Sequence, residues 1–184
     1  MGTAVFCQGK VLMEKFNFNL LNTDNNARAG LIQTAHGEIE TPIFMPVGTS
    51  GSVKAMHLKD VKTLGAQIIL GNTYHLMLRP GEKIMKKFRG LRKFISWDLP
   101  LLTDSGGFQI MSLSKLTKIN QSGVEFQSHI DGTKFFLTPE KSTKFQKFLD
   151  ATISMQLDEC IPSPSTKEKT YASTILSLEW AKKS

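Results

Sequence analysis

Two short segments of the sequence carry side chains that could perform chemistry on a substrate. Asp104–Gln109 reads DSGGFQ and Asp158–Cys160 reads DEC, and each follows an apolar run that ends abruptly. A carboxylate at the end of a strand can act as a general base, and two glycines let backbone N–H groups come close to a ligand. Unlike surroundings separate the pKa values of two carboxylates, so Asp104 and Asp158 could divide into a base and a recognition group.

Each segment also has a purely structural interpretation. Asp104 could cap the following helix beside a glycine turn, and Asp158 with Glu159 could form a solvated acidic loop. Asn72, in the run NTYH, could line the same site or cap a helix. Cys160 has no His partner nearby in the sequence, so we interpret it as a small buried apolar residue rather than a nucleophile.

The spacing of histidines and cysteines predicts no metal site, whereas a cluster of basic residues is compatible with a phosphate site. The four histidines do not pair with one another or with either cysteine at zinc-ligand spacing, so we expect no local metal site. A basic stretch opposed only by Glu82 could contact phosphate or form a solvated helix face. Its members are Lys83, Lys86, Lys87, Arg89, Arg92 and Lys93.

The elements that must position these residues alternate between strand and helix. Four apolar runs rich in Ile, Leu, Val and Met predict buried strands. They are Pro42–Val47, Ala66–Leu70, Leu99–Thr103 and Ala151–Leu157. Helices are expected at Leu58–Leu64, Gly81–Phe88, Pro139–Leu149 and Thr166–Lys183. Four strand-helix units predict a parallel α/β fold in which reactive groups collect at the carboxyl ends of the strands.

Two stretches interrupt this alternation. Phe16–Glu40, with turns at Asp24–Asn26 and His36–Gly37, predicts an antiparallel β leader, and Gly123–Leu137 predicts an inserted hairpin. Four parallel units make half of an eight-fold barrel, which leaves two strand edges and an apolar face open. A flavodoxin-like open sheet is the alternative, although its strands come at shorter and more even spacing. Either the sheet is open or part of the chain is missing.

Composition supports one folded domain of ordinary size. Of the 184 residues, 40% are apolar, and the 23 Lys and Arg exceed the 16 Asp and Glu to give a net charge of +7. This balance favours a polyanionic partner such as RNA or DNA. Two cysteines exclude a disulfide framework, and no apolar run has the length of a membrane span or a signal peptide. We therefore expect a cytoplasmic protein with no membrane partner.

Five runs of the sequence closely resemble bacterial tRNA-guanine transglycosylases, in the order found in that family. The similarity extends from about Phe16 to the last residue. The runs are Phe44–Thr49 (FMPVGT), Gly71–Gly81 (GNTYHLMLRPG), Thr103–Gln109 (TDSGGFQ), Ser128–Gly132 (SHIDG) and Asp158–Cys160 (DEC).

The resemblance implies a zinc-containing TIM (β/α)8-barrel enzyme that replaces the wobble guanine of certain tRNAs with a deazaguanine precursor of queuosine. In that family, the position of Asp104 is the general base, that of Asp158 reads the edge of the base, and that of Phe108 stacks on it. An ionised carboxylate suits Asp158, because it accepts both the ring N–H and the exocyclic amine of a guanine-like base. The implied substrate-binding positions are Asp104, Ser105, Gly106, Gly107, Phe108 and Asp158, with Asn72 and Cys160 as further candidates for the pocket.

Other parts of the family pattern are expected outside this chain, which stops after Ser184 at about half of the family's length. The resemblance places the nucleophilic Asp and the zinc ligands in a second half. Residues 1–12 precede the usual start, which predicts a non-family extension followed by the N-terminal half of the barrel at residues 13–184. The implied partners are tRNA, a guanine or deazaguanine base, the second half and a second copy of the protein. The alternatives are a non-catalytic truncated remnant, an RNA-binding accessory half, or a small nucleoside-processing α/β enzyme that uses the same carboxylates.

Overall fold

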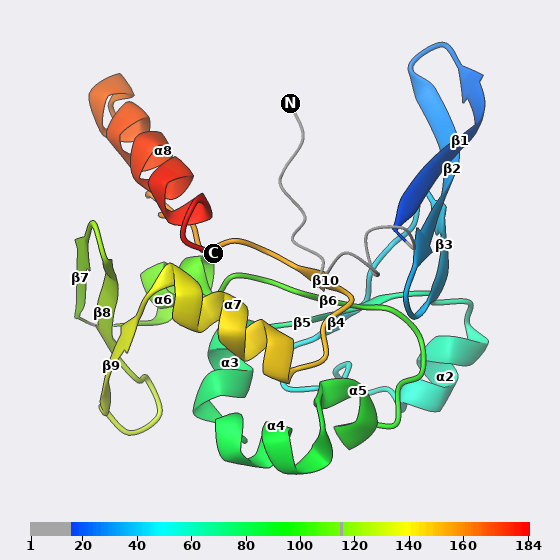
Figure 1. Cartoon of the computed structure of the whole chain (residues 1–184), viewed down its shortest axis with the longest axis horizontal. Helices are drawn as coiled ribbons and strands as arrows, with labels where there is room; N and C mark the ends of the chain where they lie inside the picture. The colour runs from blue at the N-terminus through cyan, green and yellow to red at the C-terminus, as the bar shows by residue number, and fades with distance from the viewer. Residues whose placement is uncertain (1–15, 115) are drawn as a thin grey trace.

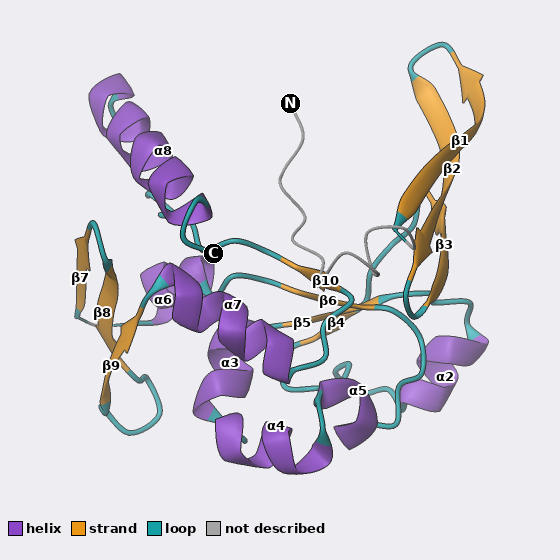
Figure 2. Ribbon diagram, viewed as in Figure 1, coloured by secondary structure: helices purple, strands orange, loops and turns teal. Residues whose placement is uncertain are grey.

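The described part of the chain has an α/β fold, with three separate sheets and helices packed against the central one (Figure 1). A computed structural model of the chain describes residues 16–114 and 116–184. The expected extension at residues 1–12, and the domain boundary after it, lie outside the described residues. Figure 2 shows that the strands of the central sheet lie above a layer of helices. Among the helices described, none combines the length and the hydropathy needed to cross a bilayer.

The central sheet has four parallel strands in the order β10-β6-β5-β4. They are β4 (Val47–Gly48), β5 (Ile69–Gly71), β6 (Leu101–Thr103) and β10 (Ile153–Ser154). All four predicted strands are confirmed, although each is shorter than its apolar run. β4 overlaps its predicted run only at Val47, because Pro42 and Pro46 have no N–H group to donate to a neighbouring strand. Each strand lies next to the strand of the same sheet that follows it in the chain, unlike the order in a flavodoxin-like sheet.

One face of this sheet is covered by helices. α3 (Thr73–Leu78), α4 (Glu82–Phe88), α5 (Leu91–Phe94) and α7 (Pro139–Phe148) lie together on that side (Figure 1). The strand residues Ile69 and Leu101 point into this core. The helix residues that pack there with them are Leu76, Met85, Leu91 and Phe145.

The other face of the sheet carries a row of apolar side chains in register. Val47 pairs with Leu70, Leu70 with Leu102, and Leu102 with Ile153, so the four side chains share one face. Val47 is 48% exposed, and the other three are half-buried. We call this side of the central sheet, which carries the row Val47, Leu70, Leu102 and Ile153, the open face. No helix of residues 16–114 or 116–184 covers it (Figure 1). Parallel sheets are normally covered on both faces, so an uncovered apolar face is unusual for a sheet of this kind.

Two antiparallel sheets flank the central one. The predicted leader is confirmed as β1 (Asn17–Asp24), β2 (Ala27–Thr34) and β3 (Gly37–Thr41). The predicted hairpin is confirmed as β8 (Gly123–Gln127) and β9 (Lys134–Leu137). A further strand, β7 (Thr117–Asn120), pairs with β8 and was not predicted from the sequence.

Three more helices complete the described fold. α2 (Leu58–Thr63) and α8 (Lys167–Ala181) were predicted, whereas α6 (Gly107–Leu113), α3 and α5 were not. The missed helices span one or two turns, which is too short to show a helical period in the sequence. A second apolar core joins α3, α6, the hairpin and α8, and it contains Tyr74, Ile110, Val124, Phe126, Leu137, Leu157 and Trp180.

Candidate functional site

The candidate site lies where three neighbouring parallel strands end. Asn72 follows β5, Asp104 follows β6, and Asp158 lies four residues beyond the end of β10. Because β10, β6 and β5 are adjacent and parallel, their carboxyl ends meet at one edge of the sheet. The structure therefore brings together the segments that the sequence singled out, and parallel α/β folds bind ligands at this edge.

Asp104 is held by donors from two other segments. Its Oδ1 accepts the backbone N–H of Thr73 (2.7 Å), and its Oδ2 accepts the side-chain amides of Gln109 (2.8 Å) and Asn72. The Thr73 hydroxyl also donates to the Asp104 carbonyl oxygen (2.6 Å). The interpretation of Asp104 as a cap for its own following helix is wrong, because it binds the first N–H of α3 and α6 begins after Gly106.

Ser105 connects the turn after β6 to Asp158. Its hydroxyl donates to Asp158 Oδ1 (2.8 Å) and accepts the backbone N–H of Gly107 (3.1 Å). Its carbonyl oxygen accepts the hydroxyl of Ser142 from α7 (2.8 Å). The two acidic segments are thus linked through the buried Ser105 side chain, whose hydroxyl is held by its hydrogen bonds to Asp158 and to the Gly107 N–H.

The glycines of this turn permit its close packing. Gly106 has a φ of 87°, in the left-handed region that favours glycine. A Cβ atom on Gly107 would lie 2.5 Å from the Asp158 carbonyl oxygen and 3.1 Å from Asp158 Oδ1. Gly107 therefore lets the Asp158 backbone pack closely against the turn, and the close approach of backbone N–H groups to a ligand stays a prediction.

Gly107→Ala is expected to lower the free energy of unfolding by about 1–3 kcal/mol, because the added methyl group collides with the Asp158 carbonyl. Urea unfolding followed by circular dichroism measures this loss. Gly48→Ala is the matched control, since a Cβ atom there meets its nearest neighbours at 3.5 Å, an ordinary contact distance. An equal loss in both variants would contradict the proposed contact.

Cys160 is a poor nucleophile in this setting. Its thiol donates to Asp158 Oδ2 (3.3 Å), and burial together with the Asp158 charge raises the pKa of the thiol to about 12. The thiol therefore stays protonated at neutral pH, whereas both nucleophilic attack and zinc binding need the thiolate. Among the described residues, no group of three or more His, Cys, Asp or Glu side chains is placed to hold a metal ion.

A small hollow of about 200 Å³ opens beside Asp158. Gly107, Asp158, Cys160 and Trp180 of α8 are among the residues that line it. Asp104 and Phe108 do not line this hollow. The Phe108 ring is 58% exposed on α6, so its face is available to a ligand at the surface.

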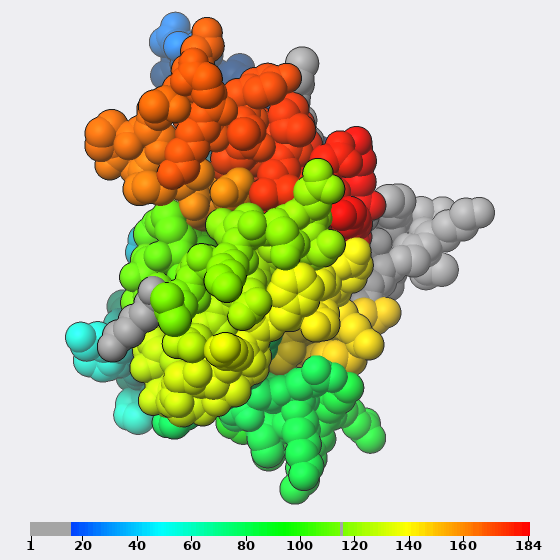
Figure 3. Space-filling view, turned by 90° about the vertical axis from the view of Figure 1, so that its left-hand side faces the viewer, coloured from blue at the N-terminus to red at the C-terminus, as the bar shows by residue number. Residues whose placement is uncertain are grey.

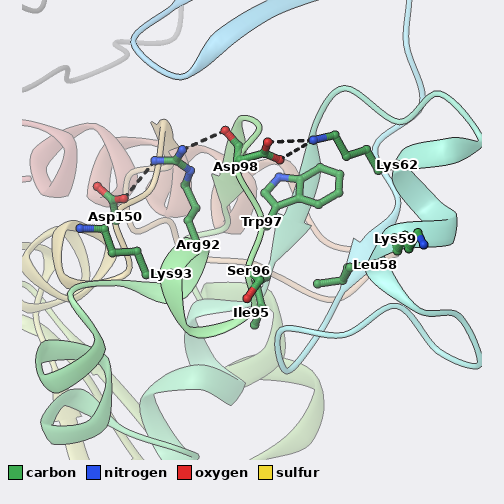
Figure 4. Close-up of a pocket in the computed structure, with 10 residues that line it drawn as sticks. All are labelled: Leu58, Lys59, Lys62, Arg92, Lys93, Ile95, Ser96, Trp97, Asp98 and Asp150. Carbon is green, nitrogen blue, oxygen red and sulfur yellow. Dashed lines mark hydrogen bonds and ion pairs between the residues drawn. The ribbon is translucent and has the colours of Figure 1, made fainter.

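A larger hollow of about 670 Å³ lies away from these residues, among α2, α5 and the loop before β6 (Figure 4). Its charged groups are largely satisfied by one another. Arg92 donates to Asp150 Oδ2 (3.0 Å) and to the Asp98 carbonyl oxygen (3.1 Å), and Lys62 binds the Asp98 carboxylate (2.8 Å). These contacts join α2, α5 and the segments before β6 and β10, so they stabilise the fold.

Two features of the site were not assigned a role from the sequence. Gln109 donates to Asp104 through its Nε2, while its buried Oε1 has no partner among the described residues. The Tyr74 hydroxyl makes a hydrogen bond with His129 Nδ1 (2.8 Å), which ties the hairpin loop to α3. Burial lowers the pKa of His75, and the neighbouring His129 adds to this effect while Asp104 opposes it. The Tyr74–His129 contact joins residues 55 positions apart, whereas Gln109 lies five positions from Asp104. Only the presence of Gln109 and His129 inside the quoted motifs pointed to these features.

Comparison with known proteins identifies the family. A sequence model described as "Queuine tRNA-ribosyltransferase" matches residues 23–184. The chain belongs to the queuine tRNA-ribosyltransferase family. Proteins of that name from Rickettsia felis and Rickettsia prowazekii are 56% and 57% identical to it over 172 residues. Each match covers 94% of this chain and 48% of the relative, so the chain spans about half the length of the curated relatives it matches.

Membership of the queuine tRNA-ribosyltransferase family confirms the resemblance stated from the five motifs. The motif residues Asp104 to Gln109 and Asp158 to Cys160 lie inside the matched range. The relatives are named as transferases that act on tRNA. The roles of individual residues in this chain are proposed below.

Proposed function

We propose that this chain is the base-handling half of a tRNA-guanine transglycosylase, which replaces the wobble guanine of certain tRNAs with a deazaguanine precursor of queuosine. The observation that carries the proposal is the meeting of Asp104 and Asp158 at the ends of neighbouring strands, linked through Ser105. Family membership supports the reaction class. A tRNA substrate places the protein in the cytoplasm, and we infer a dimer of complete enzymes from the family resemblance.

In this proposal the two carboxylates have separate tasks. Asp104 removes a proton from a ring nitrogen of the incoming base, and its contacts to Thr73 and Gln109 keep the carboxylate in one orientation. Asp158 accepts the donors on the edge of a guanine-like base. Its present donors are the hydroxyl of Ser105 and the thiol of Cys160, and a base would compete with them for the carboxylate oxygens.

Phe108 and the glycine turn complete the proposed base site. The exposed ring of Phe108 can stack on a base whatever its polar pattern, because every base has a π-face. Gly106 and Gly107 leave room for backbone N–H groups near a carbonyl oxygen of the base. Asn72 acts indirectly, through the hydrogen bond to Asp104.

Zinc, which the family resemblance implies, has no fitting site among the described residues. Cys160 is protonated and bonded to Asp158, and the described residues offer no third His, Cys, Asp or Glu side chain placed to complete a metal site there. We therefore derive no step through a metal ion from this half of the protein.

The central sheet supports the proposal that this chain is half of a barrel. Its four parallel strands follow chain order, with α3, α4, α5 and α7 on one face and the apolar row of the open face on the other. In a closed (β/α)8 barrel, such a row becomes the filled interior and both edge strands gain partners. A second half would supply the nucleophilic Asp and cover this surface.

Complementation tests the proposal. This chain is mixed with the part of the Rickettsia prowazekii relative that it does not match, and labelled guanine is added with a queuosine-type tRNA. We expect label to enter tRNA in the mixture and not with either polypeptide alone, since the proposal divides the reacting groups between the two halves. A mixture that forms a complex but exchanges no guanine would contradict the proposed function and favour an accessory or inactive half. Turnover of a free nucleoside without tRNA would instead indicate a small-molecule enzyme.

A further inference from the structure

One buried polar atom beside Asp104 has no hydrogen-bond partner. Gln109, on the first turn of α6, donates through its Nε2 to Asp104 Oδ2 (2.8 Å), while its own Oε1 is buried and unpaired among the described residues. Buried polar side-chain atoms are nearly always paired, because an unpaired one lowers the stability of the fold. The unpaired oxygen belongs to the amide that already binds the Asp104 carboxylate, so a second hydrogen-bonded state of this pair would account for it.

Among the described residues, every group hydrogen-bonded to the Asp104 carboxylate is a donor. Thr73 supplies a backbone N–H, and Asn72 and Gln109 supply side-chain amides. An ionised carboxylate only accepts hydrogen bonds, so this set fits it, whereas a protonated carboxyl group also carries an O–H donor. Once Asp104 has taken up a proton, its O–H would face donors alone unless one neighbour changes.

The Gln109 amide is the neighbour best placed to change. The Thr73 N–H belongs to the backbone of α3 and cannot turn, and the Asn72 amide oxygen is not one of the buried atoms that lack a partner. A half-turn about the last side-chain torsion of Gln109, which has two nearly equivalent orientations, exchanges Nε2 and Oε1. A separation of 2.8 Å from Asp104 Oδ2 suits an O–H···O bond as well as an N–H···O bond. One amide atom is unpaired before and after the turn, so the protonation state of Asp104 decides which orientation is favoured.

The backbone that carries Gln109 is held in place. The next residue of α6, Ile110, is 1% exposed and belongs to the second apolar core, together with Phe126 of the hairpin and Trp180 of α8. Figure 3 shows the hairpin and α8 next to each other at this end of the molecule. The side-chain amide can therefore turn while the helix stays fixed.

We propose that Gln109 is a positioning residue with two hydrogen-bonded states, which holds Asp104 both as a carboxylate and as the carboxylic acid formed during base exchange. This inference rests on the proposed function, in which Asp104 takes a proton from a ring nitrogen of the incoming base. In that step the N–H bond breaks and an O–H bond forms on Asp104, while the electron pair stays on the ring nitrogen. The Gln109 amide then turns, and its Oε1 accepts the new O–H. This directs the proton away from the ring nitrogen, whose electron pair is left free to bond to the ribose carbon.

Nuclear magnetic resonance of the full chain tests the turn without tRNA, a free base or the second half. Glutamine is labelled with ¹³C and ¹⁵N, and Gln109→Met identifies the Gln109 signals by their loss. Asp104→Asn imitates the protonated state, because asparagine is neutral and carries a permanent donor. We expect the Gln109 Cδ signal to move downfield in Asp104→Asn as Oε1 gains a hydrogen bond, and the Nε2 proton signals to move upfield as Nε2 loses one.

Two controls accompany this measurement. The exposed side chain of Gln121 is an internal reference whose signals should not move, and Asp60→Asn removes an exposed carboxylate from α2 and should leave the Gln109 signals unchanged. Gln109 signals in Asp104→Asn that equal those of the parent chain would overturn the proposal.

Guanine exchange by the complemented enzyme tests what the turn does for the reaction. Gln109→Met keeps the length of the side chain but removes the amide, so we expect kcat to fall at least about tenfold, with KM for guanine within about threefold of the parent. Because Gln109 acts through Asp104, Gln109→Met should cause no further loss in the Asp104→Asn background. Gln121→Met is the matched control and should exchange guanine at the parent rate. An equal loss in both backgrounds, or a rise in KM as large as the fall in kcat, would contradict the positioning role.

The two experiments separate this inference from the proposed function on which it rests. A parent mixture that exchanges no guanine contradicts the proposed function, while the resonance measurement on the chain alone still decides whether the amide turns. Active exchange together with a Gln109 amide that does not turn contradicts only the inference. Far-ultraviolet circular dichroism verifies that each variant is folded.

Discussion

Asp104→Asn is expected to lower the rate of guanine exchange in the complemented enzyme by about 10²- to 10⁴-fold, the usual contribution of a general base. The amide cannot accept the proton of the incoming base. Its Oδ1 can still accept the Thr73 N–H, but its NH₂ group would face the Asn72 and Gln109 amides, which are donors as well. Single-turnover incorporation of labelled guanine measures the rate.

The binding of tRNA should change little in the same variant, because a general base acts on the reaction and not on the phosphates. Asp60→Asn is the matched control, since it removes one exposed carboxylate from α2 and should leave exchange unchanged. If Asp104→Asn weakens tRNA binding as much as it slows exchange, Asp104 is a binding or structural residue. Exchange at the parent rate would exclude the role of a general base.

Gln146→Leu is expected to lower the free energy of unfolding by about 3–5 kcal/mol and the melting temperature by about 10 °C. The Gln146 side chain is fully buried in α7. Its Oε1 accepts the Thr103 hydroxyl (2.8 Å) and the Met155 N–H (2.9 Å), and its Nε2 donates to the Met155 carbonyl oxygen (2.7 Å). Leucine fills a similar volume but leaves the Thr103 hydroxyl and the Met155 carbonyl oxygen without this partner, while the Met155 N–H keeps only its bond to the Thr103 carbonyl oxygen (3.2 Å).

Thermal and urea unfolding followed by circular dichroism measure this loss. Gln121→Leu provides the control, because the exposed Gln121 side chain makes no hydrogen bond with the described residues, and we expect a change within about 0.5 kcal/mol. In the complemented enzyme, Gln146→Leu should also impair exchange, since β10 leads directly to Asp158. A stability equal to that of the parent chain would show that these hydrogen bonds do not hold α7 to the sheet.

Much of the candidate site could be predicted from the sequence, because local signals determine it. Abrupt ends of apolar runs placed Asp104 and Asp158 at strand ends, and parallel strands in neighbouring positions bring such ends together. The helix expected at Pro139–Leu149 is present as α7, and Thr138 caps its start by accepting the Lys141 N–H (3.2 Å). The short helices α3, α5 and α6 could not be predicted, since one or two turns are too short to show a helical period of apolar residues.

Partners from distant segments could not be predicted. Asp104 binds the N-terminus of α3, which lies 31 residues earlier in the chain, and the Gln146 side chain binds Thr103 from 43 residues away. No local pattern specifies such pairs, because the chain must fold before a buried donor meets its acceptor. The same holds for Ser105, whose role as the link between the two acidic segments depends on how closely the glycine turn packs on Asp158.

The sequence by itself determined the four parallel strands, the longer helices and the acids at the strand ends, because apolar runs and turn residues act over a few neighbouring positions. Its five motifs pointed to the family. The tertiary structure alone decided which donors hold Asp104, which sheet face the helices cover and which face stays open. Each of these depends on packing between elements far apart in the chain, where the free energy comes from burial and from pairing of buried polar groups.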